Sequence, residues 1–377
     1  MATSEIIKTH ISNEMVDALR AQVGKSWSRQ YAPWEIDGSR ISRSQIRRWA
    51  VRIGDLRPVF LDLDYAATTP WGTILAPPGM LQDHDQFDPG VHGLPGCQPI
   101  LAACRLDWEL PIRLGDLLVP TTTLRAMREV TQPPGHGRVV AQELETEITN
   151  ESGKRIGSVR SVWNCYERGS QAQRALYGKR TEPHMYQRED IEALKAEYKL
   201  EQARGAAPLY WEDAALDDEL PSLLKGPTTQ TKYVGKGIGR WHLGHGQGWD
   251  MYEKHPQLFF MNEHQAPEPI EAMDWVHYRV TRYAGLPGAL ESNTERIHWT
   301  IHHLMNWMGD HGRVRRLDLE FPIQNILGDT TRCGARVSGK RAVDGAHTVV
   351  LEVWNTNQLG ERVTTGTAEV ELPVRSK

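Results

Sequence analysis

The sequence predicts an α+β protein made of two copies of one small domain, joined in tandem. The first observation is an internal repeat: residues 106–116 read LDWELPIRLGD, and residues 317–329 read LDLEFPIQNILGD. The second is that each copy is followed by two strand-like runs separated by a turn, at 150–153 and at 357–360. The offset of about 210 residues is far longer than a solenoid repeat. The repeat therefore indicates a duplicated domain, with a ligand site between the two copies.

Length, charge and cysteine content limit the classes of protein to consider. A chain of 377 residues exceeds a usual single core, so two domains are expected. The net charge of −4 and the pI near 6.4 give no reason to expect nucleic-acid binding. The sequence has no 18-residue apolar run and no signal-peptide pattern at its start. Four scattered cysteines without a CxxC pair fit a reducing compartment. We therefore expect a cytoplasmic protein without a membrane partner.

The first copy is expected to span residues 1–168, including a leader with a short helix at about 12–23. Ser42 is in the position of a helix cap, apolar residues follow at helical spacing, and Gly54 ends the pattern. Residues 62–100 are rich in Gly and Pro, which predicts a long loop with a short helix or two. Strands follow around the turn at Gly115 and Asp116, and then at 139–148 and 156–166. The copy is thus a helix with an antiparallel sheet.

Residues 169–207 are polar and are expected to form a linker, with a surface helix at about 190–204. The second copy is expected at 208–377, with an insertion at about 250–292. Its helix is well specified: Ser292 and Glu295 match a capping box, and Gly309 marks the end. One face of this helix is apolar, with Ile297, Ile301, Leu304, Met305 and Met308. The sheet of this copy is expected from residue 315 to 372.

These residues resemble a known family. Residues 53–60 (IGDLRPVF), followed by Ala66-Ala67 and by 76–78 (APP), look like the N-terminal domain of the MaoC-like acyl dehydratases. Residues 302–310 (HHLMNWMGD) resemble a subgroup hallmark in the second half. The resemblance implies a tandem double hot-dog fold, in which a long central helix is wrapped by an antiparallel sheet in each copy. It also implies hydration of enoyl-CoA or dehydration of 3-hydroxyacyl-CoA, with coenzyme A as part of the substrate and no other cofactor.

The family pattern Gly-Asp-x-Asn-Pro-x-His supplies an Asp and a His that activate a water, because one group must take a proton and another must give one. The thioester carbonyl is held by a backbone N–H at the start of the central helix. In the first copy Asp55 matches the Asp, but Arg57 replaces Asn and Phe60 replaces His. The second copy has residues 244–250 (GHGQGWD) in roughly the right place, with His245 and Asp250 in swapped order. A swapped pair can do the same work, because the roles depend on geometry.

Nine of the fifteen histidines lie between residues 242 and 311, which favours chemistry in this segment. His298 and His302 are four residues apart on the predicted helix, with His303 further round it. For any single histidine, a hydrogen-bonded structural role is the alternative. The His298–His302 spacing suits a metal, but no Glu follows as in HExxH and no Cys lies nearby, so a metal site is not expected.

The site residues implied by the resemblance and by this clustering are of two kinds. For acid–base catalysis we expect His245, Asp250, His302 and His303, with Asp55 from the first copy. Arg48 and Arg52 form a basic stripe on the first helix that suits the phosphates of coenzyme A, although a solvated helix face is the alternative. The substrate pocket is expected to include Trp249, Asn306, Trp307 and Asp310. Asp116 and Asp329 are expected to be turn residues.

The expected function is that of a hydro-lyase on acyl-CoA thioesters. The thirteen tryptophans and the insertion suggest a bulky acyl group. The alternatives are a hot-dog acyl-CoA thioesterase, a non-catalytic subunit of a heteromeric hydratase or lyase, and a lyase or aldolase that reuses the enolate-stabilising site. Hot-dog units usually pair, so a homodimer is expected, or a hetero-oligomer with a second hot-dog or thiolase-type subunit.

Overall fold

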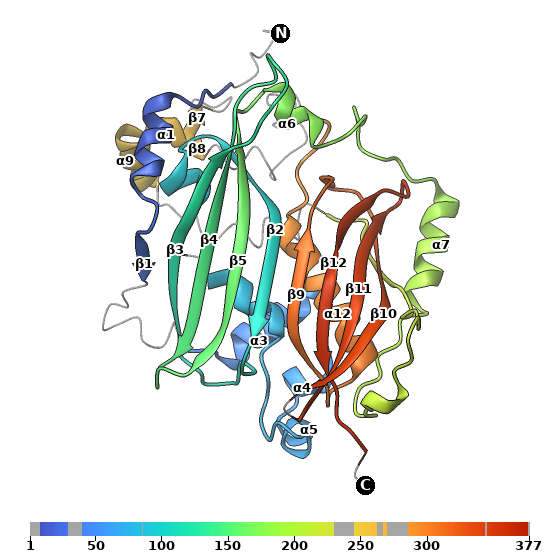
Figure 1. Cartoon of the computed structure of the whole chain (residues 1–377). Helices are drawn as coiled ribbons and strands as arrows, with labels where there is room; N and C mark the ends of the chain where they lie inside the picture. The colour runs from blue at the N-terminus through green and yellow to red at the C-terminus, as the bar shows by residue number, and fades with distance from the viewer. Residues whose placement is uncertain are drawn as a thin grey trace.

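A computed structural model describes residues 8–28, 40–84, 86–229, 245–261, 267–269, 286–343 and 345–375. One curved sheet of ten strands runs through the molecule, in the order β1-β3-β4-β5-β2-β9-β12-β11-β10-β6 (Figure 1). All its neighbours are antiparallel. The first half supplies β1 (Ser26–Ser28), β2 (Gln98–Trp108), β3 (Leu118–Glu129), β4 (Val139–Asn150) and β5 (Arg155–Tyr166). The second half supplies β6 (Leu223–Lys225), β9 (Arg313–Glu320), β10 (Thr331–Val343), β11 (Ala346–Asn357) and β12 (Arg362–Glu371).

The two halves are joined at the centre of this sheet, where β2 pairs with β9. Leu106 of the first repeat lies directly opposite Leu317 of the second. On either side of this seam the strand order is mirrored, with β5, β4 and β3 in one half and β12, β11 and β10 in the other. The predicted duplication is therefore confirmed as a pseudo-twofold arrangement whose axis passes through the repeated sequences.

The Gly-Asp turns of the repeat have the same structure in both copies. The Asp116 carboxylate accepts a hydrogen bond from the Arg113 backbone N–H at 2.7 Å. Asp329 accepts one from the Ile326 backbone N–H at 2.9 Å. Each aspartate thus closes its own turn across three residues, as predicted for turn-forming side chains.

The central helix of the second half is α12 (Asn293–Met308), which ends at Gly309 with a φ of 71°. Its bounds agree with the prediction, but the predicted capping box is wrong. The Ser292 hydroxyl is 2.8 Å from the Thr294 hydroxyl and caps no backbone N–H. Glu295 is buried and lies 3.6 Å from Arg52 of the first half, so that this carboxylate is engaged away from the cap.

The first half has shorter helices behind its sheet. They are α3 (Arg43–Ile53), α4 (Pro58–Leu61), α5 (Leu63–Thr68), the 3-10 helix η1 (Pro78–His84) and the π-helical turn η2 (Pro89–Gly93). Ser42 and Gln45 form a capping box at α3, which confirms the predicted start. The leader forms α1 (Asn13–Arg20), capped by Ser12.

The segment between the halves contains α6 (Gln171–Ala175) and α7 (Arg188–Tyr198), the latter ending six residues before the predicted bound of Arg204. The remaining described elements are η3 (Trp211–Asp213), α9 (His245–Lys254), η4 (Pro256–Leu258) and the small pair β7 (Phe259–Met261) and β8 (Pro267–Pro269). None of the described helices is long and apolar enough to cross a membrane.

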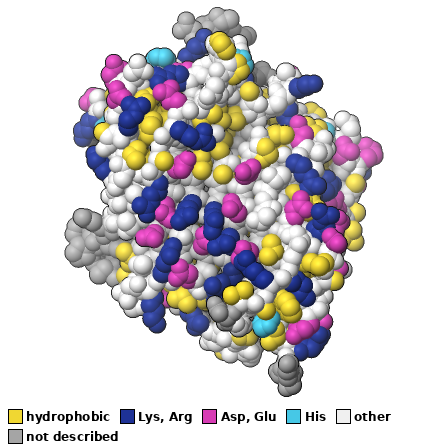
Figure 2. Space-filling model, viewed as in Figure 1, with side chains coloured by type: hydrophobic (Ala, Val, Ile, Leu, Met, Phe, Trp, Pro, Cys, Tyr) yellow, Lys and Arg dark blue, Asp and Glu magenta, His cyan; other side chains and the backbone are white. Residues whose placement is uncertain are grey.

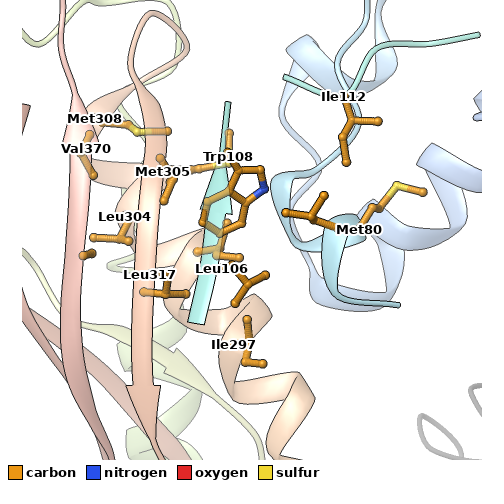
Figure 3. Close-up of a cluster of buried hydrophobic side chains, with 14 of the residues drawn as sticks. Met80, Leu106, Trp108, Ile112, Ile297, Leu304, Met305, Met308, Leu317 and Val370 are labelled. Carbon is orange, nitrogen blue, oxygen red and sulfur yellow. The ribbon is translucent and has the colours of Figure 1, made fainter. Parts of the chain in front are cut away.

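One hydrophobic core extends across both halves. Trp108 and Leu106 of β2 pack with Leu304, Met305 and other residues of α12, and Figure 3 shows Met80 and Ile112 approaching from the opposite side. Every residue of α12 is buried except Trp307, which is half-buried. Because strand residues alternate between faces, the outer face of the sheet carries the polar side chains. Figure 2 shows basic and acidic groups interleaved on this face. Ion pairs between neighbouring strands include Arg316–Asp107 and Arg313–Glu371.

Candidate active site

The two halves meet in a buried polar cluster that begins where α3 ends. Gly54 adopts a φ of 77°, and the chain turns so that the Asp55 N–H donates to the Ala50 carbonyl at 2.9 Å. This left-handed turn favours glycine. It directs the Asp55 side chain into the interior, where the residue is 3% exposed. The residue that matches the family's aspartate is therefore held in a fixed position by the local turn.

Arg57 connects this turn to α12. Its Nε donates to Asp55 Oδ1 at 2.7 Å, its Nη1 to the Met305 carbonyl at 2.9 Å, and its Nη2 to Asn306 Oδ1 at 2.7 Å. Its Nη1 is also 3.7 Å from Asp310 Oδ1. The arginine found where the family has asparagine thus binds the first half to the central helix of the second. Arg57 uses the planar fork of guanidinium donors for this purpose.

His302 of α12 faces Asp55 across the junction. Its Nε2 is 3.9 Å from Asp55 Oδ1 and 3.3 Å from Glu201 Oε1, and its Nδ1 is 2.8 Å from Lys225 Nζ. The second carboxylate oxygen of Asp55 is buried and accepts no hydrogen bond from any described residue. A carboxylate and an imidazole from different halves therefore lie side by side, with one carboxylate oxygen free for a water or a substrate.

The ionisation of these groups follows from burial and charge. Burial lowers the pKa of His302, the carboxylates of Glu201 and Asp55 oppose this effect, and Lys225 and Arg57 add to it. For Glu201, partial burial alone would raise the pKa, but the hydrogen bond to His302 and the charge of Lys225 lower it to about 2. At neutral pH the cluster therefore contains a neutral imidazole beside an ionised Glu201.

Asn306 and Asp310, which the sequence suggested as substrate-binding residues, lie at the same junction and hydrogen-bond to other residues of it. Asn306 donates from Nδ2 to Glu201 Oε1 at 3.1 Å. Asp310 accepts a hydrogen bond from the Tyr65 hydroxyl at 2.6 Å, while its backbone carbonyl accepts one from Trp71 Nε1 at 2.7 Å. Burial and Asp310 together raise the pKa of Tyr65 to about 12. Asp310 therefore anchors the first half, and it does not contact His302 in the structure.

His303 points away from the cluster. Its Nε2 donates to the Pro221 carbonyl at 2.7 Å, and the residue is 1% exposed. Burial lowers its pKa from 6.5 to about 4. This geometry suits a structural histidine that stays neutral and ties α12 to the segment before β6.

His303 gives a testable pH dependence of stability. Because its folded pKa lies below the unfolded value, the neutral form is favoured in the fold, and this stabilisation is lost as pH falls from 6.5 towards 4. The expected loss from this one group is roughly 3 kcal/mol over that range. His303→Gln keeps an N–H donor for Pro221 and cannot titrate. Urea unfolding at several pH values between 7 and 4 would give the free energy of unfolding as a function of pH. This free energy should fall less steeply with decreasing pH in the variant than in the native chain, and an equal fall in both would contradict the assignment.

Other predicted residues lie elsewhere. His245, Trp249 and Asp250 are in α9, which Figure 1 places beside α1, β7 and β8, far from α12. Trp249 is 46% exposed. The structure therefore does not bring the His245–Asp250 pair to Asp55 and His302, because this glycine-rich run forms a helix on the outside of the first half.

The predicted basic stripe is divided between two environments. Arg48 is exposed on α3. Arg52 stacks over Trp49 at 3.9 Å and lies 3.8 Å from Asp83 and 3.6 Å from Glu295. Its positive charge is thus shared with two carboxylates. Trp307 lies half-buried on α12, and its backbone carbonyl accepts a hydrogen bond from Arg204.

The predicted histidine pair on α12 does not converge on one point. His298 packs edge-on against Trp49, and a Cβ at Gly79 would collide with its Nδ1. His302 lies one turn further along, at the Asp55 junction. Within the part of the chain that the structure describes, no three His, Cys, Asp or Glu side chains are grouped so that they could hold a metal ion.

An apolar cavity lies next to the polar cluster. Its volume is about 40 Å³, and its lining includes Phe60, Trp108, Met305 and Met308. Met305 links the two features, because its carbonyl accepts from Arg57 while its side chain lines the cavity. Phe60, at the position of the family's histidine, is thus part of an apolar wall and not of the polar cluster.

Sequence reasoning missed Lys225 and Glu201. Lys225 follows two leucines on the short strand β6, and Glu201 lies in a polar stretch after α7. Neither residue is in a motif, and both reach His302 only through the fold. The one available indication is that Lys225 ends an apolar strand, where a lysine is seldom buried unless it has a partner.

Comparisons with known proteins agree with the observed fold. The model of the FAS1-like dehydratase domain region matches residues 30–159. A UPF0336 protein from Parafrankia sp. is 31% identical over 128 residues, covering 31% of this chain and 77% of that protein. A solved structure described as a MaoC-like dehydratase has 16% identity and a TM-score of 0.60, covering 95% of this chain and 100% of that one. A Mycobacterium tuberculosis protein described as a double hotdog fold has 12% identity and a TM-score of 0.55, covering 93% and 96%. At these identities, the solved structures confirm the predicted fold.

Proposed function

Because this chain belongs to the MaoC-like dehydratase family, we propose that it catalyses the addition of water to an enoyl-CoA thioester, or the reverse reaction, at the junction of its halves. The observation that carries the proposal is the position of His302 beside Asp55. The family's histidine position is occupied by Phe60, and the central helix of the second half supplies an imidazole 3.9 Å from the retained carboxylate. The carboxylate that moves the proton and the imidazole that holds the water thus come from different copies.

The chemistry assigns each group one task. In hydration, Asp55 takes a proton from water through its free oxygen, and the water oxygen bonds to C3 of the enoyl thioester. The π electrons move towards the thioester carbonyl, and the protonated Asp55 then delivers its proton to C2, which regenerates the carboxylate. The single Nε2–H of His302 is shared between Glu201 Oε1, 3.3 Å away, and the attacking water, and so holds that water beside Asp55. Such positioned proton transfer contributes about 10²–10⁴-fold to a rate.

The apolar cavity beside Phe60 and Met305 is the proposed site for the acyl group. Its volume of about 40 Å³ corresponds to only a few water-sized spaces. The bulky acyl group expected from the sequence rested partly on the insertion, where residues 262–266 and 270–285 lie outside the described residues. We therefore propose testing a series from crotonyl-CoA to ring-containing enoyl-CoA. A bulky acyl group is supported only if kcat/KM rises along the series.

The deciding experiment is an assay of the purified full chain with enoyl-CoA thioesters. Hydration lowers the enoyl absorbance without releasing thiol, whereas a thioesterase releases free coenzyme A. We expect loss of enoyl absorbance, formation of the 3-hydroxyacyl product and no thiol. Thiol release alone would favour the thioesterase. Activity only after co-expression with a second hot-dog or thiolase-type chain would favour the non-catalytic subunit.

Phe60→His tests whether the first-copy motif position is the catalytic one. Phe60 is 2% exposed and lines the apolar cavity, so an imidazole there would lose hydrogen bonds to water. We expect a loss of about 1–3 kcal/mol in the free energy of unfolding and no gain in hydration rate. Phe60→Leu is the matched apolar control. A tenfold gain in rate for Phe60→His would contradict the assignment of His302.

A further inference from the structure

The His302 imidazole is held from both sides by residues that belong to neither family motif. We infer that Lys225 and Glu201 are positioning residues that fix His302 as the tautomer with its proton on Nε2, facing Asp55. This inference rests on the proposed function for its catalytic meaning. The tautomer of His302, however, can be measured whether or not the protein is active.

Lys225 determines which imidazole nitrogen is the acceptor. Its ammonium group donates to the Ile53 carbonyl at 3.1 Å and lies 2.8 Å from His302 Nδ1. An ammonium has donors only, so Nδ1 must accept and the imidazole proton must be on Nε2. Ile53 is the last residue of α3, where free carbonyls and the helix dipole favour a cation. The contact with the end of α3 therefore anchors the Lys225 ammonium in the position from which it contacts His302.

Glu201 provides the acceptor on the other side. Its Oε1 lies 3.3 Å from His302 Nε2 and also accepts from Asn306 Nδ2 at 3.1 Å. The segment that carries it is fastened to the second half, because the Arg204 N–H donates to the Asn306 carbonyl at 3.0 Å and Glu197 makes paired hydrogen bonds with Arg332. Glu201 thus orients the Nε2–H of His302. The Glu201 side chain is 31% exposed, whereas that of His302 is 2% exposed, so Glu201 lies between the imidazole and solvent.

The charges around His302 balance. Asp55 and Arg57 face it from the turn after α3, Lys225 from β6 and Glu201 from the linker, while His303 is its neighbour on α12. Removing one charge should therefore move the protonation of His302 in a predictable direction. Loss of the cation makes protonation easier, and loss of the Glu201 anion makes it harder. A residue that only fills space would cause neither change.

The test uses the full chain with Lys225→Met and Glu201→Gln. Lys340→Met is the matched control, because Lys340 also donates to a backbone carbonyl, that of Ala214, away from the site. The readouts are the ¹⁵N spectrum of the His302 ring, identified by its absence in His302→Gln, and the pH dependence of hydration. In the native chain we expect a neutral ring with its proton on Nε2.

In Lys225→Met the ammonium no longer keeps a proton off Nδ1, so the Nδ1–H form should appear or the ring should become charged. The midpoint of His302 titration should rise by about one pH unit for Lys225→Met and fall for Glu201→Gln. Where the native chain is active, kcat should fall at least tenfold in Lys225→Met, with KM changed less. An Nδ1–H ring in the native chain, or midpoints that stay the same or move together in both variants, would overturn the inference.

The ring spectrum and the activity assay distinguish the proposed hydratase function from the positioning roles of Lys225 and Glu201. If the native chain has no hydratase activity but its ring has the Nε2 proton and responds to both variants, the proposed function fails and the positioning roles stand. If Lys225→Met does not fold, the spectrum and titration of Glu201→Gln decide alone.

Discussion

Asp55→Asn is expected to lower the rate of enoyl-thioester hydration by about 10²–10⁴-fold, because the amide cannot take the proton of the attacking water. The amide oxygen can still accept the hydrogen bond from Arg57 Nε, which is now 2.7 Å from the carboxylate. The fold should therefore persist, and the loss should appear in kcat with little change in KM. Steady-state kinetics with crotonyl-CoA, together with a thermal unfolding curve, would measure both effects.

Asp310→Asn is the matched control for this variant. Asp310 is also buried and also faces Arg57, at 3.7 Å, but its hydrogen bond is with Tyr65 and it does not contact His302. We expect it to lower stability with a much smaller effect on kcat. If both variants lose activity equally, or if Asp55→Asn keeps more than a tenth of the native rate, Asp55 is not the base.

Arg57→Met is expected to destabilise the protein by about 3–5 kcal/mol, because it leaves buried carboxylates without their cation. Its guanidinium contacts Asp55, the Met305 carbonyl, Asn306 and Asp310. Methionine replaces the apolar part of the side chain but satisfies none of these acceptors. For a chain of this size, we expect the melting temperature to fall by roughly 5 °C. Calorimetry and urea unfolding would measure the effect.

Arg105→Met provides the comparison for Arg57→Met. Arg105 also bonds a carboxylate two residues away, with Nε 2.9 Å from Asp107, but on the solvated face of the sheet. Exposed pairs contribute at most about 1 kcal/mol. A loss below 1 kcal/mol for Arg57→Met, or equal losses for the two variants, would show that the junction does not depend on this arginine.

The architecture was predictable because it is repeated. The two LD–P–LGD segments marked a duplicated unit, and the structure places Leu106 directly opposite Leu317 at the seam. The end of α12 at Gly309 was also predictable, since it follows from a local backbone requirement. The capping box was not formed, because Glu295 lies near Arg52, a contact between residues more than 240 positions apart that no local pattern encodes.

The candidate site was predictable only where a motif or a helical spacing marked it. Asp55 was found from the family pattern, and His302, Asn306 and Asp310 from the segment 302–310. Lys225 was missed because its contact with His302 depends on the pairing of β6 with β10 at the edge of the sheet. His245 and Asp250 had suitable residue types in a glycine-rich run, but residue type does not determine where a helix packs.

The pairing of β2 with β9 has a consequence for how a substrate enters. A hinge between the halves would have to break the backbone hydrogen bonds of this ladder and open a core shared by both halves. Large relative motions are the default only where domains share small, polar interfaces. The two halves are therefore held in one relative position, and under the proposed function a thioester would have to reach Asp55 and His302 without a hinge motion between the halves.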